Sequence, residues 1–181
     1  MIVVTTCRRP TQRIRSFAKD LANSHPSTIL LTRGKTGLVE LAAAARNLKS
    51  NRIATVSRWM GGPGRIEFLN SHTDPPSQLI VYLKDVRLRR EHGKCRTGKA
   101  EIVTTPETLR SETYKFAGWY SNFFGLELLD IGLSRRSRVS IHISEDSNLI
   151  RVALISPPSE TRIGPSFTIS RIDWGKAETA R

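Results

Sequence analysis

Apolar residues along the chain alternate between short β-branched runs and longer segments in which they recur every three or four positions. Ile14, Phe17 and Leu21 follow the longer spacing, which is typical of a helix with one buried face. The resulting β-α-β-α-β order predicts an α/β layer with at least partly parallel strands. Strands are expected over 1–6, 28–32 and 52–59, and helices over 11–23 and 38–49.

The remaining chain continues this pattern with more strands and one further helix. Thr104 and Thr105 precede Pro106 and Glu107, an order that favours a helix start, and the helix is expected to run to Phe124. Residues 89–99 are basic and lack periodicity, so we expect an exposed arm or hairpin tip there. Further strands are expected over 65–69, 78–88, 138–144, 148–156 and 166–173.

Two Gly-Pro pairs form an internal echo. Gly62-Pro63 and Gly164-Pro165 each stand before an expected strand, and each is interpreted as a turn. On spacing alone, an internal duplication and two unrelated tight turns explain the echo equally well.

Composition and charge indicate a globular protein with a polyanionic partner. The 181 residues are 38% hydrophobic and 25% charged, which suits a folded chain able to bury its own core. Residues 1–99 carry 19 Lys and Arg against 6 Asp and Glu, whereas residues 100–181 carry ten of each. The whole net charge of +13 thus lies in the first half, and we expect nucleic acid there rather than a charge that serves only solubility.

Sequence motifs for catalysis and for cofactor or metal binding are not recognised. Gly34-Lys35-Thr36 resembles the end of a phosphate-binding loop, but Ile29 replaces the required earlier glycine. Cys7 and Cys95 match no zinc spacing, and the four histidines show no ligand pattern, so His142 is interpreted as structural. No run reaches the length of a membrane span, and no signal peptide is recognised, so we expect a cytoplasmic protein without cofactor.

Basic residues near element ends are the candidate RNA contacts. Arg8 and Arg9 precede an expected helix N-terminus, where free N–H groups favour a phosphate, and the same holds for Arg33 and Lys35. Five aromatic residues are candidate stacking platforms for bases, but a Phe pair at a helix end is more often part of the core, so none of them is predicted to contact RNA. They are Trp59, Trp119, Tyr120, Phe123 and Phe124. The full set of candidates is Arg8, Arg9, Arg13, Arg33, Lys35, Arg58, Arg65, Arg89, Arg90, Lys94, Arg96 and Lys99.

Four segments occur in the order found in Brix-domain proteins, and the chain resembles the short archaeal members of that family. They are TTCRRPT at 5–11, RGK at 33–35, GGPGRIEF at 61–68 and IGPSFTI at 163–169. The second glycine of the first Gly-Pro motif, Gly64, stands where relatives outside the archaea commonly carry threonine followed by an aromatic residue.

The resemblance implies an α/β fold of two pseudo-repeated halves, each a mixed sheet with helices and similar to the anticodon-binding domain of class II aminoacyl-tRNA synthetases. Residues 1–181 would form a single Brix domain, with a basic half over 1–99 and a neutral half over 100–181. It also implies binding of precursor ribosomal RNA in small-subunit processing, without catalysis.

Two other functions stay open on the residues alone. The chain could be an assembly adaptor that binds a ribosomal protein, with its basic face providing only nonspecific attraction. It could also be an RNA-processing enzyme whose catalytic residues are scattered along the sequence. The predicted partners are therefore precursor or other structured RNA, with ribosomal or ribonucleoprotein assembly proteins as the alternative.

Overall fold

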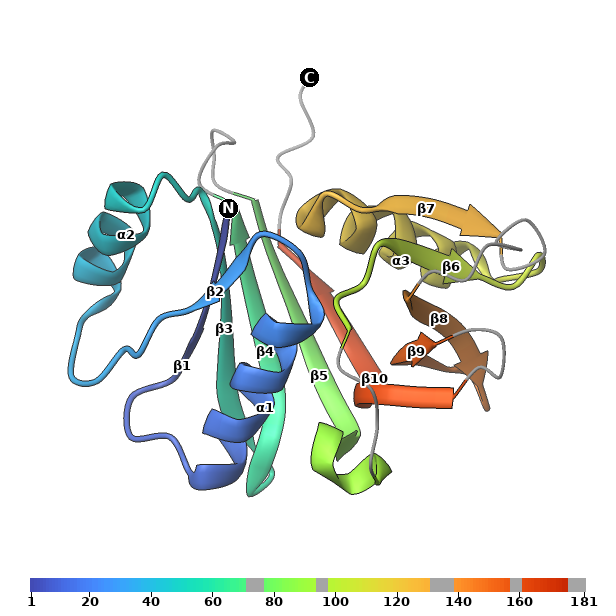
Figure 1. Ribbon diagram of the computed structural model, residues 1–181, viewed down its shortest axis with the longest axis horizontal. Coiled ribbons are helices and arrows are strands. Elements are labelled where there is room, and N and C mark those ends of the chain that lie inside the picture. Colours follow the sequence, from blue (N-terminus) through green and yellow to red (C-terminus); the bar gives the residue numbers. More distant parts are fainter. Residues whose placement is uncertain (71–76, 94–97, 131–138, 157–160, 176–181) are drawn as a thin grey trace. The chain divides into compact units, whose positions relative to one another are not determined.

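The computed structural model describes residues 1–70, 77–93, 98–130, 139–156 and 161–175. The chain divides into two compact units. The first contains residues 1–22, 27–83 and the chain after 170, and the second contains residues 23–26 and 84–170. Figure 1 traces both units along the sequence.

The first unit has a mixed sheet with the strand order β2-β1-β3-β4-β5. β1 is parallel to both β2 and β3, whereas β4 and β5 continue the sheet antiparallel. Its elements are β1 (Ile2–Thr6), α1 (Gln12–Ser24), β2 (Thr28–Leu30), α2 (Leu38–Asn47), β3 (Arg52–Trp59), β4 (Gly62–Asn70) and β5 (Ser77–Arg87).

The core of this unit follows from the two-residue period of its strands and the helical spacing of α1. Ile14, Phe17 and Leu21 on α1 are fully buried, as their spacing predicts, and Thr11 caps this helix by accepting a hydrogen bond from the backbone N–H of Ile14 at 3.3 Å. On α2, the side chains of Leu41 and Ala45 form a buried cluster with Val3 and Ile53 from the sheet.

The second unit repeats this arrangement of strands. Its order is β7-β6-β8-β9-β10, with β6 parallel to both neighbours and β9 and β10 antiparallel. Its elements are the 3-10 helix η1 (Arg89–His92), β6 (Ile102–Thr105), α3 (Ser111–Phe124), β7 (Glu127–Asp130), β8 (Ser140–Asp146), β9 (Leu149–Ser156) and β10 (Thr161–Trp174).

Helix α3 packs on β6, β7 and β8 and buries an aromatic face. Tyr120 is fully buried, and its hydroxyl lies 2.8 Å from Nε2 of His25, which is itself 1% exposed. The ring of Phe124 lies against the same histidine, with centroids 3.9 Å apart. Phe123 and Phe124 are buried, as expected for a Phe pair at a helix end.

The expected helix start at Thr104 is wrong. Ile102–Thr105 instead form β6, a strand whose four residues are all buried, and α3 begins at Ser111. β-branched residues suit a buried parallel strand as well as they suit a cap, so the local pattern is ambiguous. The short strand β7, Glu127–Asp130, was not predicted.

The prediction that each Gly-Pro pair forms a turn before a strand is wrong. Pro63 lies inside β4 opposite Arg58, where the register of β3 and β4 shifts, and Gly164-Pro165 lie inside β10 at another register shift. Proline lacks the N–H of a regular ladder, so it is tolerated at such bulges. Since β4 and β10 occupy different places in the two strand orders, the echo does not mark equivalent positions.

The basic arm expected over 89–99 is only partly described. Arg89–His92 form the 3-10 helix η1 with no buried residue, and Lys94 and Arg96 lie outside the described residues. None of the helices in the described ranges is long and apolar enough to span a membrane.

Candidate nucleic-acid interface

Three neighbouring parallel strands of the first unit end at the same edge of its sheet. The backbone N–H of Cys7, just after β1, donates to the carbonyl of Val56 in β3 at 2.8 Å, and that of Leu31, just after β2, donates to Val4 at 2.8 Å. The segments that follow these ends therefore start side by side.

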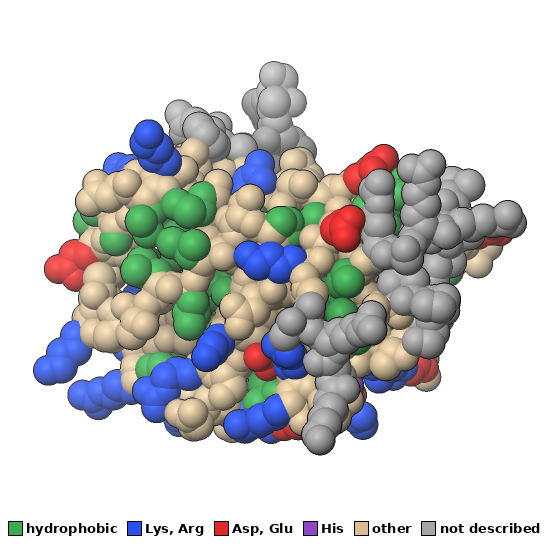
Figure 2. Space-filling view, viewed as in Figure 1, with side chains coloured by type: hydrophobic (Ala, Val, Ile, Leu, Met, Phe, Trp, Pro, Cys, Tyr) green, Lys and Arg blue, Asp and Glu red, His purple; other side chains and the backbone are tan. Residues whose placement is uncertain are grey.

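Basic residues follow two of these strand ends and lie within the third, and we name them the basic edge. Arg8 and Arg9 follow β1, Arg33 and Lys35 follow β2, and Arg58 is the penultimate residue of β3. Arg13 adds a further exposed cation in the first turn of α1. Figure 2 shows Lys and Arg side chains gathered over the connections that follow β1 and β2, at the lower left of the molecule. The basic edge consists of Arg8, Arg9, Arg13, Arg33, Lys35 and Arg58.

The connection from β2 to α2 is ordered by its own polar contacts. Nε of Arg33 donates to the carbonyl of Thr36 at 3.1 Å, which closes the turn. The guanidinium of Arg8 approaches Gly37, where an added Cβ would lie 3.6 Å from its nitrogen. The carboxylate of Glu40 accepts a hydrogen bond from the N–H of Gly37 at 2.8 Å, so part of the anion-binding capacity of this helix N-terminus is used by the chain itself.

The charge of the basic edge is largely unbalanced. Within the ranges that the structure describes, no carboxylate forms an ion pair with Arg8, Arg9, Lys35 or Arg58. All four are exposed. A surface with several exposed cations and no neutralising anion favours a polyanion, and arginine in particular can clamp a phosphate with two parallel hydrogen bonds.

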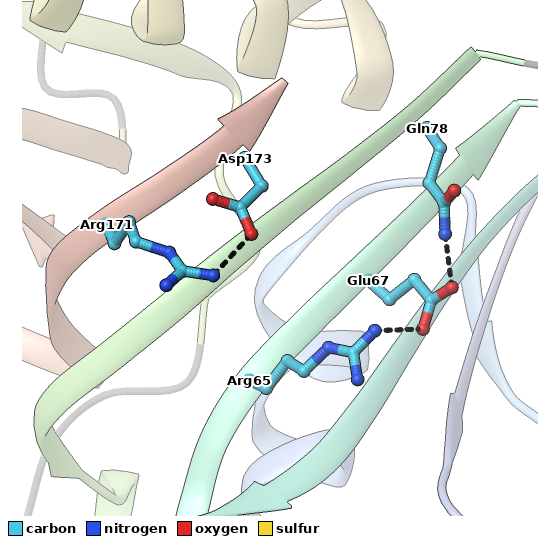
Figure 3. A network of polar contacts seen from close by, with 5 residues as sticks. All are labelled: Arg65, Glu67, Gln78, Arg171 and Asp173. Atoms are coloured by element: carbon cyan, nitrogen blue, oxygen red, sulfur yellow. Dashed lines mark hydrogen bonds and ion pairs between the residues drawn. The ribbon is translucent and has the colours of Figure 1, made fainter. Parts of the chain in front are cut away.

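Arg65 differs from the basic edge because its charge is paired. Its guanidinium lies 3.1 Å from Glu67 on the same strand, and the other oxygen of Glu67 accepts a hydrogen bond from Gln78 on β5 (Figure 3). Arg65 and Glu67 are each about one-third exposed. This pair contributes little net charge to the face of the sheet.

The remaining candidates belong to the second unit or lie outside the described residues. Arg89, Arg90 and Lys99 are in the second unit, whereas Lys94 and Arg96 are not described. The structure thus brings together Arg8, Arg9, Arg13, Arg33, Lys35 and Arg58 of the predicted set.

The histidines of the second unit have structural partners. Nδ1 of His142 lies 3.2 Å from the hydroxyl of Thr104 on the neighbouring strand. Burial, followed by the charges of Arg162 and Arg87, lowers the pKa of His92, which lies 3.3 Å from the hydroxyl of Ser166. Among the described residues, no group of three or more His, Cys, Asp or Glu side chains is placed to hold a metal ion.

Sequence reasoning missed a set of residues on the open face of the first sheet. Trp59 of β3 and Tyr82 of β5 form an edge-to-face pair with ring centroids 4.9 Å apart, and the guanidinium of Arg171 lies 4.1 Å above the Tyr82 ring. These residues come from strands far apart in the sequence. The alternation of β3 and β5 is the only local signal that places them on one face.

The fold and its basic edge define a mixed α/β protein with an exposed basic surface. No protein-family model matches the chain. It is 33% identical over 127 residues to a probable Brix domain-containing ribosomal biogenesis protein of Pyrococcus abyssi, an alignment that covers 67% of this chain and 57% of the relative. The Pyrococcus furiosus protein of the same description is 36% identical over 123 residues, covering 65% of this chain and 55% of the relative. The chain therefore spans somewhat more than half the length of these relatives.

Two solved structures have the same fold. A probable ribosomal biogenesis protein from Aeropyrum pernix superposes with a TM-score of 0.71 at 28% identity, covering 99% of this chain and 98% of that one. Mil, an archaeal Imp4-like protein, superposes with a TM-score of 0.70 at 22% identity, covering 97% of this chain and 100% of that one. The chain is thus a relative of archaeal Brix domain-containing proteins, which confirms the resemblance that its motifs predicted.

Proposed function

We propose that this protein is an RNA-binding factor of ribosome assembly that holds precursor ribosomal RNA through its basic edge and catalyses no reaction. The observation that carries the proposal is the convergence of exposed cations at the ends of three parallel strands. Four of them, Arg8, Arg9, Lys35 and Arg58, form no ion pair with a carboxylate of the described residues. The names of its Pyrococcus relatives, which refer to ribosomal biogenesis, support the choice of ribosomal RNA over other polyanions. Small-subunit processing in the cytoplasm is the step and place that we propose.

The mode of binding that suits this edge is recognition of phosphates and of RNA shape. The cations lie on short connections at strand ends, and arginine and lysine on such connections meet the backbone of a folded RNA without reading its bases. Since neutralised phosphates release counterions, affinity should fall steeply as salt rises.

We also infer that the protein is a single Brix domain of two pseudo-repeated halves, basic over 1–99 and neutral over 100–181, each similar to an anticodon-binding domain. The shared strand order and the shared orientation of the strands in the two units support the repeat. The repeat would explain why the protein contains two units of the same strand order, of which one carries the basic edge.

The test compares two double variants with the same change in charge. Arg9→Gln with Lys35→Gln removes two cations of the basic edge, whereas Arg46→Gln with Lys49→Gln removes two exposed cations at the end of α2. Binding to a fragment of precursor small-subunit rRNA is measured over a range of KCl concentrations. The first pair should weaken binding and lower the slope of log affinity against log salt by about 0.7 to 0.9 for each lost contact.

The control pair should change the slope much less. Equal effects of the two pairs would refute a defined interface and indicate diffuse attraction. Crosslinking of the tagged protein to RNA in its native cells provides the second readout. Discrete precursor-rRNA sites that disappear in an Arg8, Arg9, Arg33 and Lys35 charge-removal variant support the proposal, and an absence of rRNA sites refutes it.

A further inference from the structure

Among the described residues of the first unit, a helix covers one face of the sheet over part of its width. Helix α2 packs on Val3 and Ile53, which lie toward the β1 side of that face. By strand register, Arg65 of β4 lies opposite Ser57 of β3 and Tyr82 of β5, so these side chains share the face beyond α2. The end of β10 borders β5 here, since Gly175 donates to the carbonyl of Gln78 at 2.8 Å.

This uncovered part of the face, which we name the aromatic face, consists of Trp59, Arg65, Glu67, Gln78, Tyr82, Arg171 and Asp173. Trp59 is 45% exposed although its edge-to-face contact with Tyr82 fixes its orientation. Arg171 covers one side of the Tyr82 ring, with its guanidinium carbon 4.1 Å from the centroid. A large indole held in place and left half in water is typical of a binding surface.

The position of Trp59 is set by the bulge between β3 and β4. The register of β3 and β4 shifts between Ser57 and Arg58, so that Trp59 lies opposite Gly62. A Cβ on Gly64 would lie 2.6 Å from the carbonyl oxygen of Trp59 and 2.8 Å from its Cβ. Gly64 is therefore the residue that leaves room for Trp59.

The aromatic face and the basic edge suit different parts of a nucleotide, namely its base and its phosphate. Glu67 pairs with Arg65 at 3.1 Å, and Asp173 pairs with Arg171 at 2.6 Å (Figure 3), so the aromatic face carries no net charge. Arg58, which belongs to the basic edge, directly precedes Trp59 at the same end of β3, with its side chain on the opposite face of the sheet. An aromatic surface without net charge suits a base, and the adjoining cations suit the phosphates beside it.

We propose that the aromatic face stacks an unpaired nucleobase on Trp59 while the adjoining phosphates lie on the basic edge. This inference rests on the proposed RNA-binding function and adds a preference for RNA with unpaired nucleotides. The exposed indole accepts any base by stacking, and the paired guanidinium of Arg171 offers a second planar surface beside it.

The experiment measures the affinity of the full chain for two RNA probes, a hairpin with a single-stranded loop and a fully paired duplex of equal phosphate number. Trp59→Ala should lose about 5- to 100-fold in affinity for the looped hairpin, as expected for one lost stacking contact, with little change for the duplex. Trp59→Phe, which keeps an aromatic ring, should retain much of the affinity. Tyr114→Ala, at a tyrosine that is 60% exposed on α3, is the matched control and should bind like the wild type.

Different failures separate this inference from the proposed function. Unchanged hairpin affinity in folded Trp59→Ala, together with weaker binding of the Arg9 and Lys35 variant to both probes, would overturn the stacking site and leave the proposed function intact. If Trp59→Ala left both RNA affinities unchanged but abolished binding of a purified ribosomal protein, the face would be a protein-docking surface, and the inference would be wrong. Failure of the wild type to bind either RNA would refute both.

Discussion

The hydrogen bond between Tyr120 and His25 gives the sharpest test of how the second unit is stabilised. The Tyr120 hydroxyl lies 2.8 Å from Nε2 of His25, and the two residues are 0% and 1% exposed. Tyr120→Phe keeps the ring contacts with Phe116 and Phe124 and removes only the hydroxyl. His25 then loses this partner in a place that water does not reach.

The expected cost follows from burial. A buried polar group that loses its hydrogen-bond partner costs about 1 to 3 kcal/mol, which is a large part of the roughly 5 to 15 kcal/mol that stabilises an ordinary domain. With a urea dependence of about 2 kcal/mol per molar, the unfolding midpoint should fall by roughly 0.5 to 1.5 M. Tyr114→Phe on the same helix is the control, because Tyr114 is 60% exposed and such surface changes stay within about 0.5 kcal/mol.

The pH dependence of the same variant supplies a second, independent readout. Burial raises the pKa of Tyr120 far above its ordinary value, so the folded state keeps a proton that the unfolded state releases above about pH 10. The free energy of unfolding of the wild type should therefore fall above about pH 10, with a slope that approaches about 1.4 kcal/mol per pH unit. Tyr120→Phe lacks the contribution, so the difference in unfolding free energy between the two proteins should shrink as the pH rises.

Equal urea midpoints for Tyr120→Phe and the wild type at neutral pH would refute the buried hydrogen bond. A loss of stability in Tyr114→Phe as large as that in Tyr120→Phe would show that the effect does not depend on burial. A constant difference between wild type and Tyr120→Phe above pH 10 would contradict the raised pKa.

Two further substitutions test the bulge in β4 and the cap of α3. Gly64→Ala should destabilise the fold by about 1 to 3 kcal/mol, because its Cβ would lie 2.6 Å from the carbonyl oxygen of Trp59, and thermal melts should show no such loss for Gly62→Ala, whose Cβ meets nothing within 4 Å. The hydroxyl of Thr113 donates to the Glu145 carboxylate, and this hydrogen bond lowers the pKa of Glu145. The ionised Glu145 therefore stabilises the folded state above its unfolded pKa of about 4.3, and this stabilisation is lost in acid. Glu145→Gln should thus melt below the wild type at neutral pH, and the gap should close below about pH 4; a gap independent of pH would contradict this cause.

Much of the first unit could be predicted from the sequence because its signals are local. The apolar spacing of Ile14, Phe17 and Leu21 and the β-branched runs at 1–6 and 52–59 give elements close to those observed. In the second unit the decisive contact is distant. Helix α3 begins after Arg110, whose backbone N–H donates a hydrogen bond to the carboxylate of Glu145 at 3.1 Å. Glu145 lies on β8, 35 residues further along the chain. No local pattern near Thr104 could reveal that partner.

The candidate site was predictable as a set of charges but not as a geometry. Arg8, Arg33 and Arg58 were candidates because each stands near the end of an expected element, and the parallel pairing of β1, β2 and β3 explains why they meet. Arg65 has the same residue type, yet Glu67 pairs with it two positions away on the same face of the strand. Trp59 was considered as a stacking platform but was not predicted to contact RNA, because the sequence alone does not distinguish a buried tryptophan from one exposed beside a bulge.

The two units show why the fold alone would not explain the proposed binding of RNA. Both have a central parallel strand between two parallel neighbours, so both bring three strand ends to one edge. In the first unit these ends are basic. In the described part of the second unit, Glu107 follows β6, Asp130 ends β7, and Glu145 and Asp146 end β8.

These carboxylates have structural partners within the second unit, since Glu145 accepts hydrogen bonds at the start of α3 and Asp146 pairs with Arg151. Arg110 and Arg151 therefore offset the charges of Glu145 and Asp146, whereas no described carboxylate pairs with Arg8 or Arg9, whose charge attracts a phosphate chain. The same arrangement of strands thus supports different sets of charged residues, because the residues after each strand are free to differ while the strands keep the core. The asymmetry of charge along the sequence is therefore the feature on which the proposed placement of RNA on the first unit rests.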